Sequence, residues 1–299
     1  MKPRFTFAIP FYRGLGYLGE ALASVRAQRR DDWRCLVLDE QVEPGAAELV
    51  RSLGDARIEH RANPRCLGMV ANWNLGLDLA TTELVTLLHG DDRLLPDYAD
   101  VIAELADAHP RAVALACDAE IVDGAGRRAF SFPDWVKRRF VPAGEPWRLA
   151  GEPGLAALAR ADFVMCPTVA WRRPVLGLRR FAAGWKQVQD LDLLATLLLD
   201  GDEIVGTRRR AYAYRRHAAS ATSQQTEDMT RFEEEVAVLD RIAARAHAQG
   251  WQRAARIARG KRIVRLHLGF RAAGDLARGR VRPALAKLQY LKQTTRGAA

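Results

Sequence analysis

Two pairs of adjacent acidic residues follow apolar segments of this sequence. Asp39-Glu40 comes directly after the segment 33–38, and Asp91-Asp92 follows the segment 84–88 in the stretch LVTLLHGDDRLLPD. If both segments are parallel strands, both pairs lie at the carboxyl edge of one sheet, where open α/β sheets bind ligands. Adjacent carboxylates repel each other unless a cation joins them. The pattern favours a divalent-metal site that holds a diphosphate; the alternative is an acidic turn with Asp92 near a helix start.

Such a site needs a cation between protein carboxylates and phosphate oxygens. The sequence contains no GxxxxGK[ST] loop whose backbone would hold phosphate groups. Mg²⁺ or Mn²⁺ bound to carboxylates is the usual alternative. We therefore expect Mn²⁺ or Mg²⁺ as the cofactor.

Apolar periodicity predicts the elements that would position these residues. Strands are predicted at 5–9, 33–38, 57–60, 84–88, 111–116, 163–171, 203–205 and 211–216, and helices at 17–28, 44–53, 69–80, 96–108, 187–199 and 226–248. Strands that alternate with helices form βαβ units, so the predicted fold class is α/β with a mostly parallel sheet flanked by helices. Pro10 is expected to end the first strand. Residues 133–154 have little periodicity and are predicted to form a mobile loop over a cleft.

Composition and charge set limits on the class of protein. The 299 residues are 48% hydrophobic and 27% charged, as in an ordinary globular protein. No apolar run approaches the roughly 20 residues of a membrane span, and the N-terminal run is too short for a signal peptide. The four cysteines form no CxxC pair, which fits a reducing compartment. We therefore expect a cytoplasmic protein.

The basic character of the chain belongs to its C-terminal segment. Residues 251–299 hold thirteen Lys and Arg residues and one acid, Asp275, whereas residues 1–250 carry a net charge of −2. Apolar residues lie among the arginines, which is typical of a helix at an anionic membrane surface. A helical extension with a solvated basic face is the alternative. Nucleic acid is not expected as a partner, because no known binding motif accompanies the charge.

Several short motifs occur in a fixed order over residues 4–220. They are Ile9-Pro10-Phe11-Tyr12, Tyr17-Leu18, Ser24-Val25-Arg26-Ala27-Gln28, Leu38-Asp39-Glu40-Gln41, then Asn63, Gly68, Asn72 and Asn74, and His89-Gly90-Asp91-Asp92 followed by Pro96. In this order the sequence resembles glycosyltransferase family 2, whose members are inverting enzymes of the GT-A fold. The chain departs from the family pattern at Arg13, which replaces an Asn, at Gln41, and at His89, where an acid usually stands.

The resemblance implies a role for each matching residue. Pro10 and Tyr12 would line the nucleobase pocket, and Asp39 or Glu40 would accept a hydrogen bond from the base or ribose. Asn72, on the following helix, is assigned to the same donor site. Asp91 and Asp92 would bind the metal and the diphosphate of the sugar donor, and a histidine at position 89 can also ligate Mn²⁺. The alternative is that His89 is a structural loop histidine.

A second stretch of the resemblance carries the general base. Asp190 stands where the family has the Asp of a Glu-Asp pair, with Gln189 in place of the Glu. Asp192 points about 200° away on the same helix and cannot share that role. A positioned carboxylate can take the proton that the acceptor hydroxyl loses. The alternative is that Asp190 caps the helix and that both acids are solvated.

The segment Tyr214-Arg215-Arg216-His217, followed by Ser220, resembles a third family motif. His217 would be a further metal ligand, and Arg215 or Arg216, preferably Arg216, would bind phosphate. The alternative is a basic loop with a solvated histidine.

The resemblance divides the chain into a nucleotide-sugar-binding half (1–118), an acceptor-binding half (119–223) and a basic helical extension (224–299). It predicts transfer of a sugar from a nucleotide-diphosphate donor, preferably a UDP- or dTDP-sugar, to a glycan or lipid-linked acceptor in surface polysaccharide or glycolipid assembly. The basic segment would place the protein peripherally at the inner face of the membrane. The alternatives are a sugar-phosphate nucleotidyltransferase, suggested by the loop Phe11–Gly16, and an inactive nucleotide-sugar-binding module.

Overall fold

The computed structural model describes residues 2–217 and 229–296, so Ser220 and the predicted helix start at Thr226 lie outside the described residues. Within these residues, nine strands form one sheet with the order β3-β2-β1-β4-β8-β6-β9-β5, and β7 pairs with β9. The strands are β1 (Phe5–Phe11), β2 (Trp33–Asp39), β3 (Ile58–Ala62), β4 (Leu84–Leu87), β5 (Arg93–Leu94), β6 (Ala112–Val122), β7 (Trp147–Ala150), β8 (Val169–Arg172) and β9 (Glu203–Arg215). Strands β1 to β4 are parallel to one another, as predicted, whereas β8 is antiparallel to both of its neighbours.

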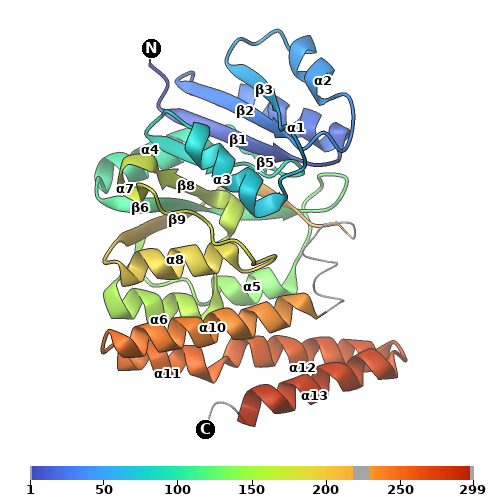
Figure 1. Cartoon of the computed structure of the whole chain (residues 1–299), viewed down its shortest axis with the longest axis vertical. Coiled ribbons are helices and arrows are strands. Elements are labelled where there is room, and N and C mark those ends of the chain that lie inside the picture. Colours follow the sequence, from blue (N-terminus) through green and yellow to red (C-terminus); the bar gives the residue numbers. More distant parts are fainter. Residues whose placement is uncertain (1, 218–228, 297–299) are drawn as a thin grey trace.

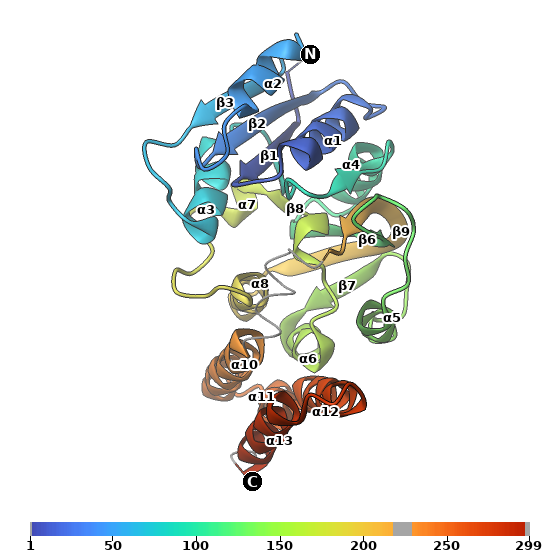
Figure 2. The ribbon, with the colours of Figure 1, turned by 90° about the vertical axis from the view of Figure 1, so that its right-hand side faces the viewer.

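Helices cover both faces of the sheet, and the C-terminal helices lie together at one end of the molecule (Figures 1 and 2). The helices are α1 (Leu15–Arg26), α2 (Ala46–Ser52), α3 (Met69–Leu79), α4 (Tyr98–Ala108), α5 (Phe132–Arg138), α6 (Gly151–Ala161), α7 (Arg173–Leu176), α8 (Gln189–Leu199), α10 (Thr230–Ala248), α11 (Gln252–Gly260), α12 (Arg262–Ala277) and α13 (Val281–Arg296), with a 3₁₀ turn η1 (Cys166–Thr168) before β8. Figure 2 shows α3 on one side of β1 and α1 and α4 on the other.

Strand β1 shows why this layered arrangement follows from the sequence. Phe5, Phe7 and Ile9 belong to the core that includes α1 and α4, whereas Ala8 belongs to the core that includes Trp73 of α3. Successive side chains of a strand point to opposite faces. A strand that is apolar at every position is therefore buried on both faces, which is the pattern of a central parallel strand.

Pro10 does not end the first strand, which continues to Phe11. Pro10 pairs with Leu38 on the β2 side, while the ladder to β4 ends two residues earlier, at Ala8 and Leu87. The missing N–H of a proline is tolerated where no neighbouring strand needs it. The strand therefore carries Phe11 to the level of Asp39.

Residues 133–154 are not the predicted loop. They contain most of α5, all of β7 and the first turn of α6. Trp147 and Leu149 of β7 are buried in the core cluster that includes α6 and α8, and the Trp147 ring lies next to Gly206 of β9. Such a short strand next to prolines has no periodicity of its own. Its conformation is set by pairing with β9, which is distant in the sequence, so local periodicity did not predict β7.

Two other predicted boundaries also differ. The strand predicted at 163–171 is confined to β8, because Pro167 lies in η1. The two strands predicted at 203–205 and 211–216 are one strand, β9, which pairs with β6 through register shifts that absorb the intervening Gly206–Arg210. The boundary proposed at residue 118 falls within β6.

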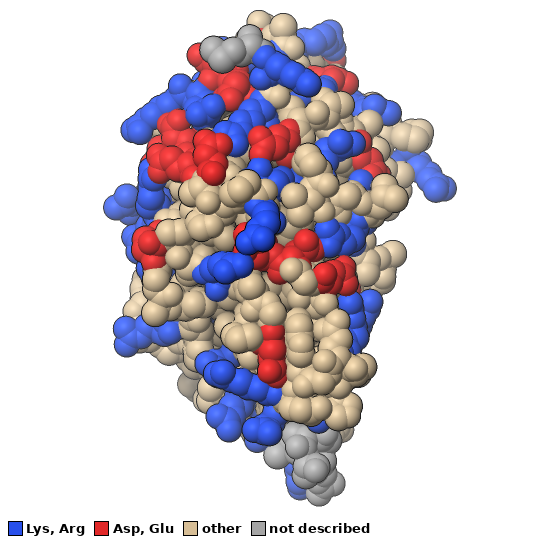
Figure 3. Space-filling view, turned by 90° about the vertical axis from the view of Figure 1, so that its left-hand side faces the viewer, with Lys and Arg blue, Asp and Glu red and all other residues tan. Residues whose placement is uncertain are grey.

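The C-terminal helices pack on the edge of the fold that carries α6 and α8. Helix α10 contributes Phe232, Val238 and Leu239 to the same core cluster as α6 and α8. Helix α13 is attached to α12 by a buried ion pair, in which Lys287 Nζ lies 2.9 Å from Asp275 Oδ2. On the face in Figure 3, acidic and basic side chains are intermingled over the sheet, whereas Lys and Arg predominate toward the lower end, where these helices lie. Among the described residues, no helix is both long and apolar enough to cross a membrane.

Candidate active site

A cavity of about 230 Å³ lies where β4, β9, α5 and α8 come together. Its lining brings together residues that are up to about half the chain apart in sequence. Among them are Trp73, His89, Asp91, Asp134, Lys137, Asp162, Cys166, Asp190, Arg216, Arg231 and Glu235. The cavity therefore joins the predicted metal site at Asp91 to the predicted base, Asp190.

Asp92 is held inside the fold by the last residues of β9. Its Oδ2 accepts a hydrogen bond from the Tyr212 hydroxyl at 3.0 Å, and its Oδ1 accepts one from the Arg215 backbone N–H at 2.7 Å. Burial, and then the charge of Asp91, raise the pKa of Asp92 well above its ordinary value. Both oxygens of Asp92 thus tie the loop after β4 to β9.

His217 lies beside Asp91 because of this attachment. Its Nε2 is 3.0 Å from Asp91 Oδ2, and its ring lies 5.6 Å, between centroids, from that of Tyr17. The Arg215 guanidinium lies over the same Tyr17 ring and binds Glu20 and the carbonyls of Asp91 and Gly124. Arg215 is buried in this network, which leaves Arg216, the preferred phosphate ligand, as the one of the pair with its guanidinium directed to the cavity residue Asp134.

The donor atoms around Asp91 fit a divalent metal. His89, Asp91 and Asp92 each place one ligand atom within 4.8 Å of the other two. His89 stacks on Trp73, and its Nε2 is buried without a hydrogen-bond partner. Burial lowers the pKa of His89, so its ring is neutral, the form that ligates metals. The Asp91 carboxylate and an imidazole nitrogen suit Mn²⁺, and carboxylate oxygen suits Mg²⁺.

Glu40 and Asn72 belong to a buried network beside β2 rather than to the lining of the cavity. Glu40 Oε1 accepts a hydrogen bond from Asn63, whose Nδ2 also donates to Asn72 Oδ1 at 3.0 Å. Glu40 Oε2 accepts from the backbone N–H groups of Leu67 and Gly68. Asn72 Nδ2 donates to the carbonyl of Leu38 at 3.0 Å. The network fixes the loop 63–68 against the carboxyl end of β2.

We expect Glu40→Ala to destabilise the protein by about 1–3 kcal/mol, the cost of leaving buried donors without an acceptor. Loss of the Glu40 carboxylate also releases the loop 63–68 from the carboxyl end of β2, and this should weaken nucleotide binding there. Urea denaturation measures the first effect and titration with nucleotide the second. Glu59→Ala is the matched control, because Glu59 is exposed and makes a surface ion pair with Arg34 worth about 0–1 kcal/mol. Equal destabilisation in both variants would contradict the role assigned to Glu40.

Asp39, Pro10 and Tyr12 lie at the carboxyl ends of β2 and β1. Asp39 is buried, its Oδ2 is 2.9 Å from His60 Nε2, and its Oδ1 accepts the Gln41 N–H at 2.7 Å. Gly90 lies next to the Pro10 carbonyl, so the end of β1 is adjacent to the Asp91 loop. The Tyr12 side chain is half-exposed. All three residues are therefore at the sheet edge at which they were predicted to meet a donor.

Asp190 lies in the first turn of α8 and lines the cavity. Burial, together with the nearby charge of Asp162, raises its pKa to about 7. No side-chain capping bond is made at the start of α8. Asp192 on the same helix is buried, where it accepts a hydrogen bond from Trp185 Nε1 and pairs with Arg241. The alternative in which both acids are solvated is therefore wrong, and Asp192 has a structural role.

Three cavity residues were not predicted from the sequence, namely Asp134 and Lys137 of α5 and Asp162 at the end of α6. Asp134 is buried and makes two hydrogen bonds of 2.7 Å to Arg216. Burial opposes ionisation of Asp134, but Arg216 holds its pKa below the ordinary value. Lys137 Nζ lies 3.2 Å from Asp162 Oδ2. These residues lie in and just beyond the segment predicted as a loop, and a helix start with Pro133 at its second position was the available signal.

A GxGxxG pattern, Gly14-Leu15-Gly16-Tyr17-Leu18-Gly19, covers the N-cap and the first residues of α1. Such a pattern places free N–H groups at a helix start, where a phosphate binds in other folds. Here the N–H groups of Gly14 and Leu15 donate to the carboxylate of Glu43. An anion of the protein itself therefore already occupies this helix start, which argues against the nucleotidyltransferase alternative.

Comparison with known proteins places this arrangement in a known class. The family model described as "Glycosyl transferase family 2" matches residues 6–173. An uncharacterized protein of Sinorhizobium fredii, y4gI, is 30% identical over 139 residues, which cover 44% of this chain and 15% of that protein. The match thus spans a small part of this curated relative.

Two solved structures share the fold. Staphylococcus aureus TarS 1-349 in complex with UDP-GlcNAc is 17% identical, with a TM-score of 0.68 over 98% of this chain and 81% of that one. The mannosyltransferase PcManGT of Pyrobaculum calidifontis, in complex with GDP-Man and Mn²⁺, is 14% identical, with a TM-score of 0.63 over 100% of this chain and 86% of that one. These likenesses confirm the predicted α/β fold of the GT-A type.

Proposed function

This chain belongs to glycosyltransferase family 2, and we propose that it transfers a sugar from a nucleoside-diphosphate donor to an acceptor hydroxyl with inversion, using Mn²⁺ or Mg²⁺. The observation that carries the proposal is the shared cavity of Asp91 and Asp190. His89 and Asp91 line this cavity, and with the buried Asp92 they place ligand atoms within 4.8 Å of one another. Asp190 lines the same cavity, and the pKa of its carboxyl group, about 7, suits a general base.

The residues of the chain would divide the work as follows. Asp91, with His89 and His217 beside it, would hold the metal, and Asp92 would fix the loop that carries Asp91. A bound Mn²⁺ or Mg²⁺ would offset the negative charge on the departing diphosphate. Asp190 would accept the proton of the acceptor hydroxyl. At the same time the hydroxyl oxygen would bond to the anomeric carbon of the donor, and the bond from that carbon to the diphosphate would break. Arg216, oriented by Asp134, would contact phosphate oxygens.

We propose a UDP- or dTDP-sugar as the donor, with Asp39, Glu40, Pro10 and Tyr12 around the nucleoside. The TarS structure is a complex with UDP-GlcNAc, and the PcManGT structure is a complex with GDP-Man and Mn²⁺. Both support a nucleotide sugar, and the base is the part of the donor that a binding experiment must decide.

A nucleotide panel tests this proposal. A ligand that binds only the folded state raises the melting temperature by mass action. We expect UDP or dTDP to raise it in the presence of Mn²⁺, and GDP to raise it less. A shift of equal size without any divalent metal would contradict the assignment of Asp91 and Asp92 to a metal site that holds the donor. No shift with any nucleoside diphosphate would overturn the proposal.

We also propose that the protein acts in surface polysaccharide or glycolipid assembly, as a cytoplasmic protein in peripheral contact with the inner face of a membrane. Two features of α11–α13 support this contact. Arg253, Arg256 and Arg259 of α11 are exposed. Large apolar side chains are also exposed on α12 and α13, namely Leu266, Phe270, Leu276, Val281, Leu285 and Leu288. Basic and apolar side chains together favour an anionic membrane surface.

A further inference from the structure

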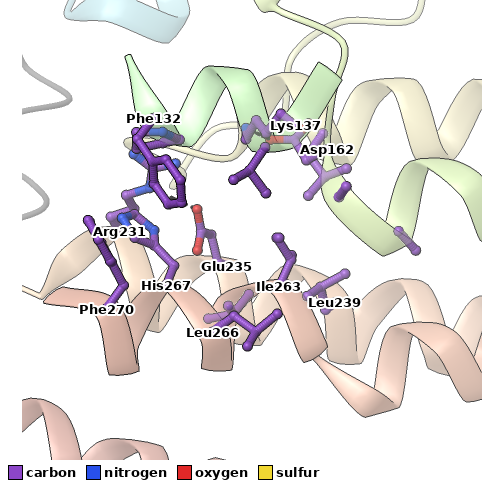
Figure 4. A pocket seen from close by; sticks show the side chains of 16 residues that line it. Phe132, Lys137, Asp162, Arg231, Glu235, Leu239, Ile263, Leu266, His267 and Phe270 are labelled. Carbon is purple, nitrogen blue, oxygen red and sulfur yellow. Dashed lines mark hydrogen bonds and ion pairs between the residues drawn. The ribbon is translucent and has the colours of Figure 1, made fainter. Parts of the chain in front are cut away.

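A second cavity, of about 300 Å³, lies between α5, α6, α10 and α12 (Figure 4). Its wall is mostly apolar. The apolar lining residues are Phe132, Pro133, Val136, Ala159, Ala161, Leu191, Leu239, Ile263, Val264, Leu266 and Phe270. Apolar cavities exclude water, because water there finds no hydrogen-bond partners. A cavity of this size and composition is in the range of small-molecule binding sites.

The apolar cavity adjoins the catalytic cavity. Four residues line both of them, namely Lys137, Asp162, Arg231 and Glu235. A molecule that fills the apolar cavity would therefore end against these four side chains, which also line the cavity of Asp190. The two cavities are neighbours that meet at this junction.

The charged residues at this junction are paired with one another. Lys137 Nζ lies 3.2 Å from Asp162 Oδ2, and Arg231 Nε lies 2.8 Å from Glu235 Oε1. Burial, followed by the charges of Arg231 and Lys137 and two further arginines, lowers the pKa of His267 to about 3. His267 is thus neutral at physiological pH. The junction therefore offers polar groups to a headgroup, and its four charged side chains form two pairs of opposite charge.

Aromatic side chains continue the apolar surface out of the cavity. Phe132 of α5 faces Phe270 of α12, with ring centroids 5.4 Å apart (Figure 4). Trp135 stacks on Phe132 at 5.8 Å. Leu266 and Phe270 are 68% and 53% exposed, respectively, on the same face of α12 as the lining. An apolar chain could therefore enter from the side of α12 that we assign to a membrane surface.

We propose that this cavity binds the apolar chain of an amphiphilic acceptor, whose hydroxyl-bearing head reaches Asp190 through the junction of Lys137, Asp162, Arg231 and Glu235. The inference rests on the proposed function and deepens it, because it names the acceptor as lipid-linked rather than a free glycan. It also gives the C-terminal helices a part in the site: α10 and α12 form one wall of the acceptor channel.

Alkyl β-D-glucosides with chains of six to ten carbons, used below their micellar concentrations, are the probe. We expect calorimetry with the full chain to show binding that tightens about fourfold for each added methylene, until the cavity is filled. Ile263→Trp fills the cavity, and Leu266→Asp places a charge at its mouth. Each variant should weaken binding of the longest glucoside by roughly tenfold or more, the loss of about two buried methylenes. Leu285→Trp is the control, because Leu285 is exposed on α13 and outside the cavity.

The metal-dependent nucleotide shift in melting temperature is measured on the same samples. It should be unchanged in Ile263→Trp, Leu266→Asp and Leu285→Trp, which also shows that the variants are folded. Glucoside binding that is absent, independent of chain length, or equal in Ile263→Trp and Leu285→Trp would overturn the acceptor inference while the nucleotide shift stands. Loss of the nucleotide shift in the unmodified protein would instead overturn the transferase proposal.

Discussion

Asp190→Asn should lower kcat by about 10²- to 10⁴-fold, the usual contribution of a positioned general base. The asparagine keeps the size and burial of the side chain but cannot take the acceptor proton. Because Asp190 does not belong to the metal-binding cluster of His89, Asp91 and Asp92, we expect the metal-dependent nucleotide shift to remain. The measurement is initial rate of sugar transfer at saturating donor.

The pH profile separates this role from a structural one. A base with a pKa of about 7 is ionised only above that pH, so the rate should rise about tenfold per pH unit below pH 7 and level off above it. Asp190→Asn should lose this acidic limb. The folded state raises the pKa of Asp190 above the ordinary 3.8, so ionisation costs stability as the pH rises from about 4 to 7. The variant should therefore be no less stable than the parent at pH 8.

Asp200→Asn is the matched control, since Asp200 is exposed at the other end of α8. It should change neither the rate nor the pH profile. An unaltered rate in Asp190→Asn would contradict its role as the base, and nucleotide binding without sugar transfer in the parent would support the inactive binding module. A rate loss that the control shares would point to a general effect of altering α8.

Asp91→Ala should remove the metal-dependent part of nucleotide binding and lower kcat/KM by on the order of 10³-fold. A metal ion contributes several kcal/mol to stabilising charge in a transition state, and each 1.36 kcal/mol is tenfold in rate. Asp91 is the member of the acidic pair that faces His217, whereas both oxygens of Asp92 are engaged by β9. Manganese titration followed by paramagnetic relaxation of water gives a readout independent of activity.

His217→Ala tests the same site through a residue that follows β9. We expect weaker manganese binding than in the parent but stronger binding than in Asp91→Ala, because a carboxylate supplies a negative charge that an imidazole ligand does not. Asp31→Ala is the control, since the Asp31 side chain is 90% exposed. Manganese affinity that is the same in Asp91→Ala as in the control would contradict the assignment of Asp91.

The N-terminal half shows how far local pattern reaches. The apolar segments before Asp39 and Asp91 were recognised as strands, because a strand buried on both faces is apolar throughout. Parallel pairing then places their carboxyl ends on one edge, so two acidic pairs in the sequence predicted one polar sheet edge. The structure has both strands with this pairing through β1.

The second half depends on contacts between distant segments, and there the predictions were less accurate. Strand β7 is defined by pairing with β9, and α5 lies between segments without periodicity. As a result, Asp134 and Lys137 were not recognised as cavity residues. Asp190 was placed correctly on a helix, but only its surroundings, burial and the charge of Asp162, raise its pKa toward neutrality.

The sequence by itself determined the α/β class, the sheet edge that carries Asp39 and Asp91, and the helix that carries Asp190, since these follow from apolar periodicity and residue type. Only the tertiary structure decided that Asp91 rather than Asp92, and Asp190 rather than Asp192, is available for chemistry in the cavity. Tyr212 and Arg215 engage Asp92, and Trp185 and Arg241 engage Asp192. Hydrogen bonding and burial of a carboxylate depend on partners from distant segments, and no local pattern specifies them.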